Sequence, residues 1–169
     1  MKEKVLFFDI DGTLVDNTYG VYDVPEGVKR ELKRIQNDGH KLFICSGRPK
    51  AMINQQFLDL GFDGYVLYNG GYIEIDGESI FEERMDTELA TQTIDMLEEL
   101  NCDYMIETAH HIYIDKRYKE LYTFFKNLGM EEMFSMDFDR NDVLKRAIKI
   151  EANVTNKDKQ RVSDYLDGK

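Results

Sequence analysis

The stretch VLFFDIDGTLVD, residues 5–16, decides the fold of this chain. It opens with a short, continuously apolar run, Val5 to Phe8, and then turns acidic. Such a run is typical of a parallel strand that is buried on both faces and ends in a loop. In sheets of this kind, ligands bind beyond the carboxyl ends of the strands. We therefore expect the functional residues to begin where this strand ends.

Two carboxylates follow the predicted strand at once, Asp9 and Asp11. Side chains at positions i and i+2 of an extended segment point the same way, so both acids can face one bound group. One can then attack that group while the other moves protons. Gly12 allows a sharp turn, and Thr13 offers a hydroxyl and a backbone N–H to phosphate oxygens.

Strands and helices alternate after this segment. Residues 25–39 predict an amphipathic helix, with Pro25 near its start and Gly39 at its end. A strand over 41–45, a helix over 49–60 and a strand over 65–68 follow. This alternation predicts right-handed βαβ crossovers and a parallel sheet, which makes the fold class α/β.

The pattern changes after residue 71, where residues 72–75 and 79–83 flank Asp76-Gly77 as in a β-hairpin. The elements expected beyond the hairpin are a helix around 89–100, strands over 103–107 and 111–115, a helix over 118–128 capped by Gly129, a strand over 146–151 and a helix over 157–166. We therefore expect a core domain over 1–75 and an α+β domain with an antiparallel sheet over 76–169.

Composition narrows the possible partners. The 169 residues are 42% hydrophobic, which is enough for one ordinary domain or two small ones. Thirty-three acidic and 22 basic residues give a net charge of −11, which argues against a nucleic-acid partner. Without a signal peptide or an apolar run of about 20 residues, we expect a cytoplasmic protein with no membrane contact. The two cysteines fit no zinc or redox motif.

Three motifs together resemble those of one family. Asp9-x-Asp11-Gly12-Thr13 resembles the first signature motif of the haloacid dehalogenase superfamily. Ser46-Gly47-Arg48-Pro49, after the second strand, resembles the second motif in its Cof-like, type IIB branch, where Tyr68-Asn69-Gly70-Gly71 is also usual. The resemblance implies a Rossmann-like core of about three strands, incomplete by comparison with the family, and an α+β cap that selects the substrate.

The same resemblance implies a magnesium-dependent phosphatase acting on a small phosphorylated metabolite such as a sugar phosphate. Asp9 would be the nucleophile that forms an aspartyl-phosphate, and Asp11 the general acid and base. Mg²⁺ would be held by the Asp9 carboxylate and the Asp11 backbone carbonyl, offsetting repulsion between carboxylate and phosphate. The residues implied to bind the phosphoryl group are Thr13, Ser46, Gly47 and Arg48.

The sequence also departs from the family pattern, because no third-motif Lys and no Gly-Asp-x-x-x-Asp motif follow the cap region. Two alternatives therefore stay open: an incomplete fragment or remnant that binds phosphate or a protein partner without turnover, and a phosphoacceptor. At the level of single residues, Arg48 could equally pair at a helix start. Asn69 could serve only a tight turn or could equally contact the substrate.

The missing core elements have a structural consequence for the first strand. The family places this strand in the middle of the sheet, so Val5 to Phe8 would here form an exposed apolar edge. We expect such an edge to pair with a symmetry mate, a swapped partner or a separately supplied C-terminal piece. Self-association through this edge is therefore an expectation.

Overall fold

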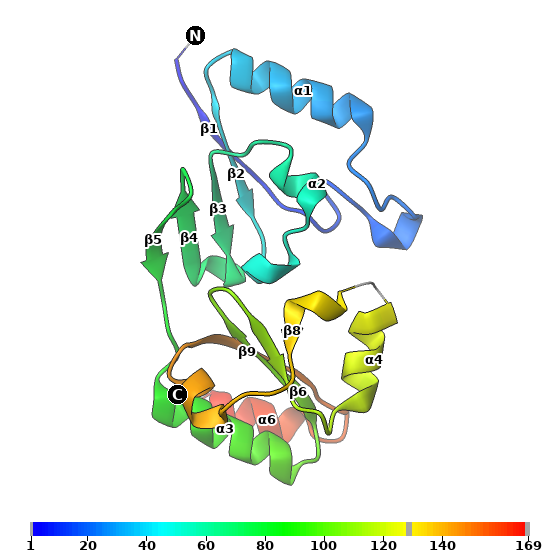
Figure 1. The fold of residues 1–169 in the computed structure, drawn as a ribbon, viewed down its shortest axis with the longest axis vertical. Helices are drawn as coiled ribbons and strands as arrows, with labels where there is room; N and C mark the ends of the chain where they lie inside the picture. Colours follow the sequence, from blue (N-terminus) through cyan, green and yellow to red (C-terminus); the bar gives the residue numbers. More distant parts are fainter. Residues whose placement is uncertain (1, 128–129, 168–169) are drawn as a thin grey trace. The chain divides into compact units, whose positions relative to one another are not determined.

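The computed structural model describes residues 2–127 and 130–167. The chain divides into two compact units, Met1–Glu83 and Arg84–Lys169 (Figure 1). The sequence analysis expected the division after residue 75. The units divide later because the second strand of the hairpin pairs with the first and extends the sheet of the first unit.

The first unit is built on a five-stranded sheet in the order β1-β2-β3-β4-β5. Its strands are β1 (Val5–Phe8), β2 (Lys41–Cys45), β3 (Gly64–Leu67), β4 (Tyr72–Ile75) and β5 (Glu78–Glu82). The first three strands are parallel, as predicted, and β4 and β5 add antiparallel neighbours. The hairpin at Asp76-Gly77 therefore widens the core sheet instead of opening the second domain.

Strand β1 stands at the edge of this sheet, where the sequence predicted an exposed apolar strand. It pairs with β2 along its whole length, from Val5 with Lys41 to Phe8 with Ile44. Val5 is 53% exposed and Phe7 is 59% exposed.

One long helix covers one side of the first sheet. Helix α1 (Glu26–Asn37) begins after Pro25 and is followed by Gly39, whose φ of +83° favours a glycine. It buries Leu32 and contacts β2. No helix in the described ranges is both long and apolar enough to cross a bilayer.

The prediction of one continuous helix over 49–60 is mostly wrong. The structure has a 3₁₀ turn at Lys50–Met52 and a short helix α2 (Gln55–Leu58). Ile53 between them is extended, with φ −86° and ψ 94°. This break lets Ile53 and Phe57 both reach the core, where they are 6% and 1% exposed. Apolar spacing alone could not show it. Further 3₁₀ turns lie at Asn17–Tyr19, Tyr68–Gly70 and Glu131–Met133.

The second unit is an α+β module around a four-stranded sheet in the order β8-β7-β6-β9. Its elements are α3 (Thr87–Glu99), β6 (Asp103–Thr108), β7 (Ile112–Ile114), α4 (Lys119–Asn127), β8 (Phe134–Ser135), α5 (Arg140–Leu144), β9 (Ala147–Asn153) and α6 (Lys159–Leu166). Three strands pair antiparallel, and β8 joins β7 in parallel. The sequence analysis missed β8 and α5, which are too short for a periodic signal. The expected cap at Gly129 lies outside the described residues.

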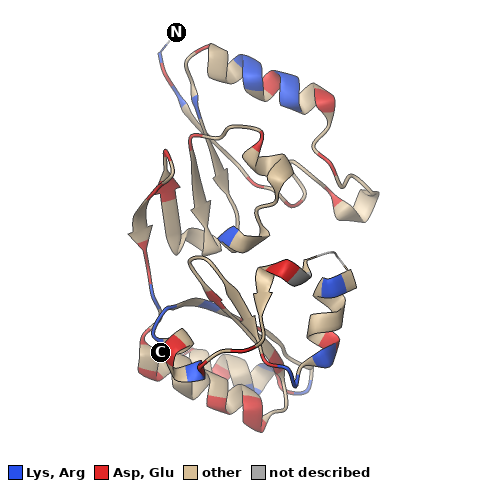
Figure 2. Cartoon of the chain, viewed as in Figure 1, with Lys and Arg blue, Asp and Glu red and all other residues tan. Residues whose placement is uncertain are grey.

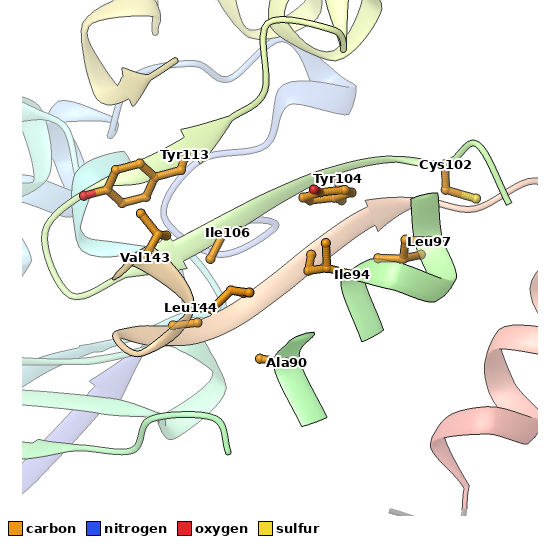
Figure 3. Close-up of a cluster of buried hydrophobic side chains, with 10 residues drawn as sticks. Ala90, Ile94, Leu97, Cys102, Tyr104, Ile106, Tyr113, Val143 and Leu144 are labelled. Carbon is orange, nitrogen blue, oxygen red and sulfur yellow. The ribbon is translucent and has the colours of Figure 1, made fainter. Parts of the chain in front are cut away.

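The core of this unit forms between α3, α5 and one face of the sheet (Figure 3). Ile94 and Leu97 of α3 meet Tyr104 and Ile106 of β6, and Leu144 of α5 closes the cluster. These side chains are at most 3% exposed. Burying large apolar side chains of this kind contributes roughly 1.5–3 kcal/mol each, which makes this cluster the main support of the unit.

A carboxyl group is buried on the other face of β6. Glu107 is 0% exposed, and its carboxylate oxygens have no hydrogen-bond partner. The nearest cation is Nζ of Lys149, 3.5 Å away, which also contacts Glu151 at 2.9 Å. Burial raises the pKa of Glu107 to about 7, against the opposing pull of Lys149. Burial therefore moves the titration of this side chain from the acidic range toward neutral pH.

Candidate active site

The chain leaves β1 through a tight turn that buries apolar residues and exposes polar ones. The N–H of Val15 donates to the carbonyl of Ile10 at 3.0 Å, and both side chains are buried. Gly12 has a φ of +83°, a conformation that costs a glycine little. Asp9 and Asp11 are both exposed. Burial of the turn's apolar residues thus fixes the loop that carries both acids.

Asp11 makes the most specific contact of this region, a two-pronged ion pair with Arg48. Nε of Arg48 donates to one carboxylate oxygen at 2.8 Å, and Nη2 donates to the other at 2.6 Å. The guanidinium also donates to the carbonyl of Met52 and lies over the ring of Phe57, 5.7 Å from its centre. The loop after β2 therefore holds Arg48 so that it faces the acid of the loop after β1.

Ser46 and Gly47 follow β2 directly. They lie beside the end of β3 and the turn after it. Ser46 is 6% exposed, its N–H donates to Val66 at 2.9 Å, and its hydroxyl accepts the N–H of Arg48 at 3.2 Å. A Cβ on Gly47 would lie 2.5 Å from Oδ1 of Asn69, closer than real Cβ contacts. A side chain at position 47 would therefore require the Asn69 amide group to move aside.

The turn after β3 packs on the second loop. Tyr68 and Asn69 both have positive φ, 54° and 57°. The N–H of Asn69 donates to the carbonyl of Ser46 at 3.4 Å, and that of Tyr68 donates to the carbonyl of Arg48 at 3.3 Å. The Tyr68 hydroxyl accepts the N–H of Lys50 at 3.0 Å. These contacts place Asn69 in a tight turn after β3.

Thr13 and Asp16, the other polar residues of the loop after β1, stabilise the conformation of the loop itself. The N–H of Thr13 donates to Ile10 at 3.3 Å, so it is engaged in the turn, while the residue itself is exposed. Asp16 accepts the N–H groups of Thr18 and Tyr19, which caps the 3₁₀ turn that follows. The Thr13 N–H, which the sequence analysis offered to phosphate oxygens, is thus used within the turn, and Asp16 has a capping role.

One charged pair beside these loops was missed by the sequence analysis. Lys50 forms an ion pair with Glu74 of β4, which is only 7% exposed and also accepts the hydroxyl of Tyr72 at 3.0 Å. Burial opposes the charge of Lys50, but its contact with Glu74 outweighs burial and raises the pKa of Lys50. In the sequence, only the acidic Glu74 among the apolar residues of β4 could have indicated this pair.

The oxygen atoms available for a cation come from the first loop. One oxygen of the Asp9 carboxylate accepts the N–H of Ile10 at 2.7 Å, and the Asp11 carboxylate is held by Arg48. Residues 2–127 and 130–167 contain no group of three or more acid, histidine or cysteine side chains that could hold a metal. The Asp9 carboxylate and the Asp11 carbonyl fit a hard cation such as Mg²⁺, which keeps several waters.

The three loops therefore form one connected site at the carboxyl ends of β1, β2 and β3. Direct contacts tie Asp11, Arg48 and Ser46 together, whereas Asp9 and Thr13 belong to it through the backbone of the first loop. The arrangement offers two carboxylates, a guanidinium and a hydroxyl. These groups can bind an anion, attack it and move a proton.

Comparison with known proteins gives a family for this arrangement. A family model described as haloacid dehalogenase-like hydrolase matches residues 6–169. The Bacillus subtilis protein YkrA is 32% identical over 82 residues, which are 48% of this chain and 31% of YkrA. The phosphatase YwpJ of the same organism is 27% identical over 120 residues, 70% of this chain and 41% of YwpJ.

Solved structures share the fold. The structure of a HAD subclass IIB sugar phosphatase superposes with a TM-score of 0.78 at 23% identity, covering 98% of this chain and 64% of the other. At this identity the likeness concerns the fold alone. The chain thus spans less than two thirds of each of these three proteins.

Proposed function

Because the chain belongs to the haloacid dehalogenase-like hydrolases, we propose that its first unit carries the phosphoryl-transfer residues of a phosphatase for a small phosphorylated metabolite, such as a sugar phosphate. The observation that supports this most directly is the Asp11–Arg48 pair, which brings an anion-binding group to the two acids that follow β1. A solved protein of the same fold is described as a sugar phosphatase, which supports the substrate class.

The proposed reaction has two steps. A carboxylate oxygen of Asp9 attacks phosphorus, the bond to the leaving oxygen breaks, and Asp11 donates a proton to that oxygen. Water then attacks the phosphorus of the aspartyl-phosphate while Asp11 accepts its proton, which releases phosphate and restores the Asp9 carboxylate. A covalent intermediate splits one difficult hydrolysis into two easier steps.

Arg48 would have to change partners during this reaction. In the structure both oxygens of Asp11 accept hydrogen bonds from its guanidinium, and a carboxylate held in this way cannot present a proton to a leaving group. A guanidinium binds phosphate with the same two-pronged geometry. We therefore assign Arg48 two partners: Asp11 before substrate binds, and the phosphoryl group afterwards, when Asp11 is released for proton transfer.

The other residues position the phosphoryl group. The hydroxyls of Thr13 and Ser46 would donate to its oxygens, and Gly47 leaves room beside Asn69. Mg²⁺, held by the Asp9 carboxylate and the Asp11 carbonyl, would supply positive charge between the nucleophile and the phosphate when bound.

Hydrolysis of p-nitrophenyl phosphate and of hexose 6-phosphates, with and without Mg²⁺, tests the proposal. We expect Mg²⁺-dependent phosphate release that falls at least a thousandfold in Asp9→Asn. Asp16→Asn is the matched control, since Asn also caps a helical turn and Asp16 lies outside the reacting groups. Equal losses in both variants, or unchanged activity in Asp9→Asn, would contradict the assigned nucleophile.

The small number of protein oxygens that could bind a cation also favours a second candidate function. In this alternative, the domain binds phosphate without turnover. The first loop offers a cation only two protein oxygens, and no larger acidic or histidine cluster occurs in the described part of the chain. This candidate predicts saturable binding of inorganic phosphate, weakened in Arg48→Ala, together with no product at any Mg²⁺ concentration. Measurable turnover excludes it.

A further inference from the structure

Arg48 is held toward Asp11 through both its backbone and its side chain. The N–H of Arg48 donates to the hydroxyl of Ser46, and its carbonyl accepts the N–H of Tyr68. Its guanidinium also donates to the carbonyl of Met52 at 3.4 Å. The side chain of Asp11 is 52% exposed, and an ion pair with so exposed an acid contributes little by itself. The direction of the guanidinium therefore depends on the turns that contact Arg48.

Lys50 joins the two turns that contact Arg48. It lies in the 3₁₀ turn after β2, and its N–H donates to the hydroxyl of Tyr68, in the turn after β3, at 3.0 Å. Figure 2 shows the basic turn after β2 beside the turn after β3. The ammonium group of Lys50 forms an ion pair with Glu74 and lies over the ring of Tyr72, 5.8 Å from its centre. This one side chain connects both turns to strand β4.

Glu74 fixes this connection to the sheet. Strand β4 lies between β3 and β5, and the Glu74 carboxylate also accepts the hydroxyl of Tyr72 at 3.0 Å. The ring of Tyr72 packs edge to face on that of Tyr68, with 6.1 Å between the ring centres. Four side chains therefore form one connected set, called the anchor network below: Lys50, Tyr68, Tyr72 and Glu74.

The charges of the anchor network are poorly explained by stability alone. The side chains of Glu74 and Lys50 are 9% and 36% exposed, and the loss of hydration opposes much of the attraction between such charges. Replacing a pair of this kind by neutral groups of similar size often leaves a protein equally stable. Glu74 also stands among apolar residues of β4, where a neutral side chain would avoid the loss of hydration. The geometry that the pair imposes is the better reason for its presence.

We propose that Lys50 and Glu74 are positioning residues that hold Arg48 toward Asp11. Their pair fixes the turn after β2 to β4, and this turn supplies the Met52 carbonyl that accepts from the guanidinium. A guanidinium that is already oriented loses less freedom when it binds an anion. The benefit for phosphoryl binding rests on the proposed function, whereas the orientation of Arg48 toward Asp11 does not depend on turnover.

Neutralising the pair without leaving a buried charge tests the proposal. The variant Lys50→Met with Glu74→Gln removes both charges and keeps an oxygen that can accept the hydroxyl of Tyr72. Nε–H of Arg48 donates to Asp11 at 2.8 Å, so its exchange with water reports on their contact. We expect this exchange to be at least tenfold faster in the double variant. It is measured by NMR on the signal that is missing from Arg48→Lys.

A second ion pair of the same sheet provides the matched control. Lys41 contacts Asp63 at 2.6 Å at the start of β2, the end of the strand opposite the loop that carries Arg48. Lys41→Met with Asp63→Asn likewise removes one charge of each sign and should leave the Arg48 exchange unchanged. Unchanged exchange in Lys50→Met with Glu74→Gln, or the same acceleration in both double variants, would overturn the proposal.

Urea unfolding separates positioning from a general loss of stability. Amide signals of the first unit should give the same urea midpoint for Lys50→Met with Glu74→Gln as for the unmodified chain. Lys50→Arg keeps a cation beside Glu74 and should retain the slow exchange of Arg48. A lowered midpoint that accompanies fast exchange in both variants would give the pair a purely structural role and refute positioning.

Phosphate binding tests the link with the proposed function separately. Titration with inorganic phosphate, followed on the amide signals of Ser46 and Gly47, should show about tenfold weaker binding in Lys50→Met with Glu74→Gln. If the unmodified chain binds no phosphate, the role of Arg48 in the proposed function fails. The exchange rates then still decide whether Lys50 and Glu74 position Arg48, because they are measured without phosphate.

Discussion

Replacing Glu107 by glutamine should remove most of the pH dependence of the second unit's stability between pH 5 and 8. The unfolded chain releases the Glu107 proton around the ordinary pKa of 4.5, whereas the folded unit keeps it until about pH 7. Over this interval the unfolded state binds fewer protons. The free energy of unfolding therefore falls as pH rises.

The size of this effect follows from the burial of the carboxyl group. Each pH unit between the two pKa values contributes about 1.4 kcal/mol. The unmodified chain should therefore lose roughly 2–3 kcal/mol between pH 5 and 8 through Glu107, with the slope ending near the folded pKa of about 7. The glutamine side chain of the variant is neutral throughout and contributes no slope. Lys149 stays charged over the whole range and keeps its contact with Glu151.

Urea unfolding at pH 5, 6, 7 and 8 measures the effect. The chain has no tryptophan, so near-ultraviolet circular dichroism of the buried tyrosines, such as Tyr72 in the first unit and Tyr104 in the second, follows the unfolding of both units. The stability of Glu107→Gln relative to the unmodified chain should rise by about 2–3 kcal/mol from pH 5 to 8. Glu120→Gln, at an exposed site, should show no such change. Parallel curves for Glu107→Gln and the unmodified chain would refute a carboxyl group kept protonated by burial.

Two further substitutions follow from the contacts of the first unit. A Cβ at Gly64 would lie 2.5 Å from the carbonyl oxygen of Glu74, so Gly64→Ala should lower the free energy of unfolding by about 2 kcal/mol or more in urea titrations. Gly27→Ala in α1, whose Cβ would meet nothing closer than 3.8 Å, should be neutral or stabilising, and equal effects would count against the close approach. Arg48→Lys should weaken inhibition by inorganic phosphate about tenfold, because an ammonium group lacks the two-pronged geometry. Arg34→Lys on exposed α1 is its control, and an unchanged inhibition constant in Arg48→Lys would show that Arg48 does not bind phosphate.

Local sequence determined the start and the end of most strands. Four apolar residues followed by two acids place β1 and the first loop, and Pro25 and Gly39 bracket α1. These signals are short-range: they reflect backbone freedom, burial and turn chemistry within a few residues. For the same reason, Asp9, Asp11 and Ser46 could be assigned to strand ends that meet at one edge of a parallel sheet.

Tertiary structure alone decided which groups contact one another. The partner of Asp11 is Arg48, 37 residues away, and that of Lys50 is Glu74, 24 residues away. The hairpin at Asp76-Gly77 is plain in the sequence, but only pairing of β3 with β4 shows that it extends the first sheet. The sequence pattern likewise could not show that Glu107 is buried without a hydrogen bond. Such features depend on which surfaces meet after the chain has folded, and no local pattern of residues encodes that choice.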